Sequence, residues 1–129
     1  MIALPEPKAD VLARRDEIIA GLRAILPASG VISEPLRLKP YETDGLPAYR
    51  QTPLAVALPE TTEQVAAVLK LCHSIGVRVV PRGAGTSLCG GAMPLADAVV
   101  IGMMRMNQIL DIDYADRCAT VQAMSLIHI

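Results

Sequence analysis

A glycine-rich segment at residues 81–91 carries most of the groups in this sequence that could bind a ligand. It runs Pro-Arg-Gly-Ala-Gly-Thr-Ser-Leu-Cys-Gly-Gly and follows residues 77–80, whose apolar character predicts a strand. Glycine has no Cβ and tolerates positive φ, so successive N–H groups can converge on phosphate oxygens. Hydroxyls and a guanidinium add further donors. We predict a phosphate or pyrophosphate cradle with contacts from Pro81, Arg82, Gly83, Ala84, Gly85, Thr86, Ser87, Gly90 and Gly91.

The surrounding residues decide which kind of phosphate site is possible. A P-loop requires a lysine after its glycines, and no lysine follows Lys70 in the sequence. A dinucleotide-binding Gly-x-Gly-x-x-Gly motif opens a helix, whereas Pro94 interrupts any helix here and residues 98–101 predict another strand. We therefore expect a loop that joins two strands without a helix. From the loop chemistry alone, a plain glycine-rich hairpin is the alternative.

The other reactive side chains are scattered and form no catalytic set. His73 and His128 have no cysteine or carboxylate at ligand spacing, so neither supports a metal site. Asp111 and Asp113 alternate on a predicted strand, where a solvated edge near a turn is favoured over an acid–base pair. Cys89 is expected to fill the loop rather than to react. We predict no catalytic residue and no metal site.

Composition excludes several classes of function. With 129 residues, 52% of them hydrophobic, the chain has enough apolar material for the core of one small domain. A net charge of −1 and three tyrosines as the whole aromatic content favour no nucleic-acid surface. No apolar stretch approaches the roughly 20 residues that cross a bilayer, and the N-terminus lacks the pattern of a signal peptide. With three widely spaced cysteines that suit reduced thiols, we predict a cytoplasmic protein without a transmembrane segment.

Hydrophobic periodicity predicts an α/β fold. Apolar residues recur at helical spacing from Asp10 to Leu26, where a proline stops the helix. Residues 27–53 contain repeated prolines and are expected to form an ordered, irregular segment. Thr61 and Gln64 match a capping box at the start of a second helix, which Gly76 ends. The predicted strands are residues 54–58, 77–80, 98–101, 109–112 and 119–121, arranged as a right-handed βαβ unit that leads into a mixed sheet.

Several of these segments, taken in order, resemble one known family. They are residues 41–50, the strand at 54–59, the helix from Thr61, the glycine-rich segment within 80–92, and residues 105–112. Together they resemble the FAD-binding N-terminal region of the glycolate oxidase D subunit, within a wider group of FAD-linked oxidases that includes D-lactate dehydrogenases and vanillyl-alcohol oxidase. The resemblance reaches about Gln122, and its length makes it more specific than the glycine motif alone.

The resemblance implies the N-terminal part of a PCMH-type FAD-binding domain. Residues 81–91 would wrap the FAD pyrophosphate with backbone amides, and the flavin would oxidise a small 2-hydroxy acid such as glycolate. The implied partners are an E-type flavoprotein and an iron–sulfur F-type subunit. Membrane association, if present, would come through those subunits.

The resemblance also divides the chain into three parts. Residues 1–52 hold the first helix and the irregular segment, residues 53–122 the first part of the FAD-binding domain, and residues 123–129 depart from the family. Because family members continue well beyond this point, we expect a truncated reading frame that lacks the substrate pocket and is inactive alone. An exposed apolar edge would favour aggregation. A phosphate- or nucleotide-binding module without redox activity, and a non-functional fragment, are the alternatives.

Overall fold

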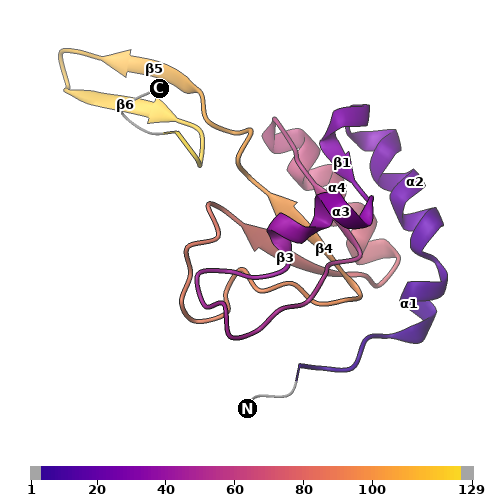
Figure 1. The fold of residues 1–129 in the computed structure, drawn as a ribbon. Helices are drawn as coiled ribbons and strands as arrows, with labels where there is room; N and C mark the ends of the chain where they lie inside the picture. Colours follow the sequence, from indigo (N-terminus) through magenta and orange to yellow (C-terminus); the bar gives the residue numbers. More distant parts are fainter. Residues whose placement is uncertain (1–3, 126–129) are drawn as a thin grey trace.

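The core of the protein is a four-stranded mixed sheet in the order β1-β2-β4-β3 (Figure 1). The computed structural model describes residues 4–125. The strands are β1 (Val31–Ile32), β2 (Ala55–Ala57), β3 (Arg78–Arg82) and β4 (Ala98–Gly102). β1 is antiparallel to β2, whereas β2 and β3 both run parallel to β4. The predicted α/β class and mixed sheet are confirmed.

Both faces of the sheet are covered, which explains why its central strands are apolar along their whole length. Side chains of successive residues alternate between the two faces: Ala57 and Ile101 pack in one core, and Val56 and Val100 in the other. The first core lies under helices α1 (Ala9–Ala13), α2 (Arg15–Ile25) and α4 (Thr62–Ser74), and the second under α3 (Pro35–Leu38) and the 3₁₀ turn η2 (Lys39–Tyr41).

The single helix predicted from Asp10 to Leu26 is two helices, α1 and α2. Arg14 separates them with φ −94° and ψ 16°, and its guanidinium donates to the Ile75 carbonyl at 3.1 Å. Leu26 is extended, because the residue before a proline avoids helical backbone angles. The break at Arg14 leaves buried residues of both helices, Val11 and Ile18, in the same core.

Helix α4 connects β2 to β3 and begins as the capping pattern predicts. The Thr61 hydroxyl accepts the Gln64 N–H at 3.3 Å. The Gln64 side chain accepts the N–H of Glu60 at 2.7 Å, one residue earlier than a standard capping box. Gly76 follows the helix with φ +71°. β2, α4 and β3 form the predicted βαβ unit, with β4 between its two strands; its handedness stays a prediction.

The irregular segment is more structured than the prolines predict. It contains the 3₁₀ turn η1 (Ala28–Gly30), β1, α3 and η2 before residues 42–53 cross to β2. β1 was not predicted because two apolar residues carry no periodicity, and the strand exists through pairing with β2. The segment closes the face of the sheet opposite α2 and α4 (Figure 1).

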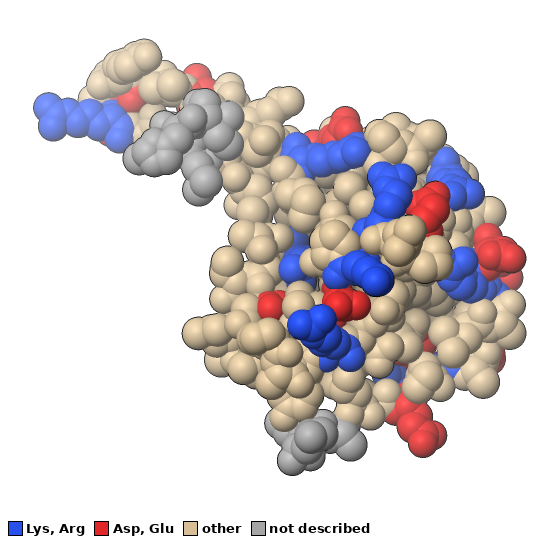
Figure 2. All heavy atoms as spheres, in the orientation of Figure 1, with Lys and Arg blue, Asp and Glu red and all other residues tan. Residues whose placement is uncertain are grey.

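The last two strands do not join the mixed sheet, which corrects the sequence-based prediction. β5 (Ile109–Asp113) and β6 (Cys118–Val121) pair only with each other, and the hairpin extends as an arm from the body (Figures 1 and 2). Its base is held by Arg105, which bonds the Glu60 carboxylate at 2.9 Å and the Ser29 carbonyl at 2.8 Å. Within residues 4–125, no helix is long and apolar enough to cross a membrane.

Candidate functional site

The glycine-rich segment opens a long loop, residues 83–97, that leaves the end of β3 and returns to the start of β4. β3 and β4 are parallel neighbours, with Arg82 opposite Gly102. A tight hairpin requires antiparallel strands, so the alternative of a plain glycine-rich turn is wrong. No helix lies in this crossover, as expected from Pro94.

The first half of this loop presents a row of unused backbone donors. The N–H groups of residues 83–88 donate to no acceptor in the part of the chain that the structure describes. Gly85 has φ +74° and Gly90 has φ +78°, backbone angles that L-residues rarely adopt. Consecutive free amides around such turns form concavities that bind anions.

Ser87 shapes the second half of the loop. Its Oγ accepts the N–H of Cys89 at 3.3 Å and that of Gly91 at 3.2 Å, so these two amides are already used. A Cβ on Gly91 would lie 3.3 Å from the same oxygen. The Thr86 hydroxyl is exposed and has no partner among the described residues.

Arg82 is buried beneath the loop rather than extended from it. Arg82 is only 9% exposed, and its guanidinium donates to the carbonyls of Thr43 at 2.7 Å and Ala92 at 3.3 Å. Its guanidinium carbon lies 5.7 Å from the centre of the Tyr41 ring. A Cβ on Gly85 would overlap the guanidinium. Arg82 therefore supports the loop from below, and its direct contact with phosphate stays a prediction.

The segment at residues 42–50 docks against the loop, a contact that the sequence did not reveal (Figure 1). The Gly45 N–H donates to the Ser87 carbonyl at 2.9 Å, and a Cβ on Gly45 would lie 2.9 Å from that oxygen. Asp44, only 7% exposed, lies next to this contact. A glycine after an aspartate is an ordinary turn signal, so the sequence indicated an ordered segment but not what it touches.

The chain after β6 also returns to the loop. The Met124 N–H donates to the Met106 carbonyl at 2.8 Å, and the Met124 sulfur lies 3.2 Å from the Cβ that Gly83 lacks. Met124 lies in residues 123–129, whose departure from the family stays a prediction. Residues 126–129 of that segment lie outside the described residues.

The remaining reactive groups do not gather into a second site. Cys89 is exposed and borders an apolar cavity of about 260 Å³ that Leu46 and Tyr49 also line. Asp113 closes the tip of the hairpin, where its Oδ1 accepts the Ala115 N–H at 2.9 Å. Burial raises the pKa of the Cys72 thiol. Residues 4–125 contain no cluster of histidine, cysteine and acidic side chains that could hold a metal ion.

The FAD binding domain family matches residues 53–126, which include the loop and strands β2, β3 and β4. The chain is 46% identical over 108 residues to glycolate oxidase subunit GlcD of Escherichia coli (strain K12), covering 84% of this chain and 22% of that protein. It is 38% identical over 108 residues to the D-2-hydroxyglutarate dehydrogenase of Xanthomonas citri pv. viticola, covering 84% of this chain and 23% of that protein.

Solved structures share the fold. p-Cresol methylhydroxylase with bound substrate aligns with a TM-score of 0.68 and 26% identity over 87% of this chain and 22% of its own. Alkyldihydroxyacetonephosphate synthase aligns with a TM-score of 0.77 and 22% identity over 97% of this chain and 24% of its own. The chain thus spans about a fifth to a quarter of the length of these relatives.

The observed loop fits the cofactor of the matching family. Free amides beside glycines at positive φ are groups of the kind that bind a diphosphate, and a buried guanidinium beneath them adds positive charge. The family match covers more than half of the sequence and includes these residues. The chain belongs to the FAD binding domain family, and its cofactor is FAD.

Proposed function

We propose that this chain is the FAD-binding part of a flavin-dependent 2-hydroxy-acid dehydrogenase or oxidase, with the loop at residues 81–91 holding the FAD diphosphate. The unused amides of residues 83–88 carry this proposal. The names of two relatives support the substrate class, because glycolate and D-2-hydroxyglutarate are both 2-hydroxy acids. This chain spans about a fifth of the length of those relatives, so the activity of the whole protein is itself part of the proposal.

The division of labour within the loop follows from its hydrogen bonds. The amides of Gly83, Ala84, Gly85 and Thr86 donate to diphosphate oxygens, and the Thr86 hydroxyl adds a donor. Pro81, Ser87, Gly90 and Gly91 set the path of the backbone around the anion, and Arg82 adds positive charge. The bound flavin supplies hydride acceptance from the hydroxy acid; the residues of this chain bind and orient the cofactor.

The organisation of the whole protein is part of the proposal. Residues 1–52 precede the FAD-binding part at residues 53–122, and the substrate pocket lies in a region that this sequence does not contain. An E-type flavoprotein and an iron–sulfur F-type subunit are the proposed electron-transfer partners. Residues 123–129 are proposed to be a departure from the family sequence.

Calorimetric titration with FAD and with ADP tests the binding role. Gly85→Val places a side chain on the buried guanidinium, whereas Gly76→Val meets nothing within 4 Å at a similar φ of +71° outside the loop. We expect saturable FAD binding that Gly85→Val abolishes and Gly76→Val retains. Equal affinity for ADP and FAD would indicate a nucleotide-binding module instead. Absence of binding to a folded wild-type chain would refute the proposal.

A further inference from the structure

Asp44 places a buried carboxylate at the contact between residues 42–50 and the glycine-rich loop. The residue is 7% exposed. Its Oδ1 accepts the Leu46 N–H at 2.9 Å, which forms a local turn. Its Oδ2 is buried and has no hydrogen-bond partner among the described residues. An unpaired buried carboxylate oxygen is costly, so this atom requires a donor from outside the described chain.

The neighbours of Asp44 on both sides bond to the loop or to the strand that leads into it. The Thr43 carbonyl accepts from Arg82 at 2.7 Å, and the Gly45 N–H donates to the Ser87 carbonyl at 2.9 Å. The residues before and after Asp44 are therefore both fixed by hydrogen bonds, to Arg82 and to Ser87. The free amides of residues 83–86 lie between these two anchor points, Arg82 and Ser87, in the sequence.

The chemistry of a carboxylate limits what its partner can be. An ionised carboxylate only accepts hydrogen bonds and repels phosphate oxygens, so Asp44 is not a phosphate ligand. In a dinucleotide, sugar hydroxyls lie next to the diphosphate and are donors. We propose that Asp44 Oδ2 accepts a hydrogen bond from a sugar hydroxyl, ribose or ribitol, of the dinucleotide whose diphosphate the loop holds. This inference rests on the proposed function.

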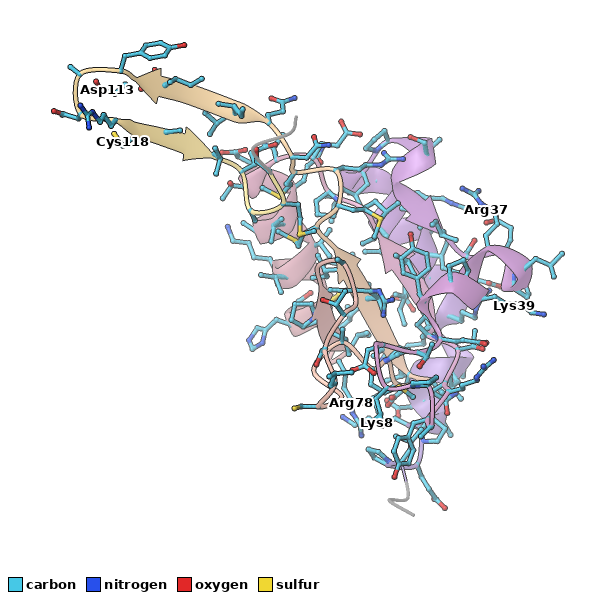
Figure 3. All side chains as sticks on the ribbon, turned by 60° about the vertical axis from the view of Figure 1, so that its left-hand side comes forward. Lys8, Arg37, Lys39, Arg78, Asp113 and Cys118 are labelled. Atoms are coloured by element: carbon cyan, nitrogen blue, oxygen red, sulfur yellow. The ribbon has the colours of Figure 1, made fainter. Side chains whose placement is uncertain are left out.

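A second buried carboxylate provides a matched control. Asp97 is 1% exposed and also has one oxygen, Oδ1, without a partner among the described residues. Its Oδ2 lies 3.5 Å from Arg78 Nε and accepts the Lys8 N–H at 3.1 Å. Lys8 and Arg78 are labelled on the same side of the molecule in Figure 3. Asp97 is the last residue of the 83–97 loop, but Arg78 begins β3, whereas the glycine-rich residues 83–91 follow the end of that strand. Asp97 thus anchors the N-terminal segment at the opposite end of β3.

The test is the affinity of the 129-residue chain for FAD, ADP and inorganic pyrophosphate, measured by calorimetry for the wild type and two variants. Asp44→Asn keeps Oδ1 and the side-chain volume but replaces the second acceptor by an amide donor. We expect it to weaken FAD binding by about 10- to 100-fold and pyrophosphate binding by less than about threefold. Asp97→Asn is expected to leave both affinities unchanged.

The two nucleotides identify the sugar. A loss that appears with ADP as well as FAD assigns the hydroxyl to ribose, and a loss confined to FAD assigns it to ribitol; both support the inference. Equal weakening of FAD and pyrophosphate would show that Asp44 only shapes the loop, and unchanged FAD binding would also overturn the inference. A wild-type chain that binds neither ligand would overturn the proposed function as well.

Discussion

Replacement of Gly85 by alanine tests the packing of the loop on Arg82. An L-residue at φ +74° costs about 1–2 kcal/mol for the backbone alone. The new Cβ would also overlap the guanidinium, which must give up bonds such as the one to the Thr43 carbonyl at 2.7 Å. A hydrogen bond from a charged donor contributes about 1.5–3 kcal/mol. We therefore expect Gly85→Ala to lower the free energy of unfolding by about 2.5–5 kcal/mol.

Gly90 separates the two contributions. It has φ +78° in the same loop, but its Cβ would meet nothing within 4 Å, so Gly90→Ala costs only the backbone part of about 1–2 kcal/mol. Urea unfolding followed by circular dichroism measures both variants. In an Arg82→Ala background, Gly85→Ala should cost no more than Gly90→Ala. Equal costs in the wild-type background would refute the placement of the guanidinium against Gly85.

Two further predictions concern burial elsewhere. Burial raises the Cys72 pKa above its ordinary 9.0, so the thiolate forms less readily in the folded than in the unfolded state. The free energy of unfolding should therefore fall as the pH rises above 9, and should show no loss from this group below that pH. Urea unfolding measures this dependence, which Cys72→Ala should remove. In the β5–β6 hairpin, Leu110 is 59% and Ile112 is 47% exposed. Changing both to threonine should alter the free energy of unfolding by less than about 0.5 kcal/mol and reduce concentration-dependent light scattering. As a control, Val100→Thr in buried β4 should strongly lower the free energy of unfolding. Unchanged scattering by the hairpin variant would show that Leu110 and Ile112 do not promote aggregation.

The features predicted correctly depend on residues close together in the sequence. The cap at Thr61 and the stop at Gly76 are each set within a few residues, and α4 follows from apolar spacing on one helix face. The connection of β3 to β4 without a helix followed from Pro94 and the glycines. Charges of both signs are interspersed on the face shown in Figure 2, as the low net charge indicates. These signals need no knowledge of the tertiary fold.

The features missed depend on contacts that the sequence separates widely. Arg82 lies 39 residues from Thr43, so the sequence presented it as a charge beside the loop and not as a buried support. Gly45 packs on the Ser87 carbonyl from a similarly distant segment. The hairpin strands alternate like sheet strands, yet whether they join the central sheet depends on which edge is available. The break at Arg14 depends on the Ile75 carbonyl, 61 residues away.

The burial of Arg82 also bears on the proposed binding of the FAD diphosphate by a loop that contains no helix. The commoner phosphate motifs use the N-terminus of a helix, whose aligned amides supply about half a positive charge. Here the loop runs from strand to strand, and the guanidinium packs under Gly85 while pairing with no carboxylate among residues 4–125. A buried charge is screened less by salt than a surface charge. In the proposed site, the positive potential that a helix end supplies in other folds therefore comes from the guanidinium beneath the glycines.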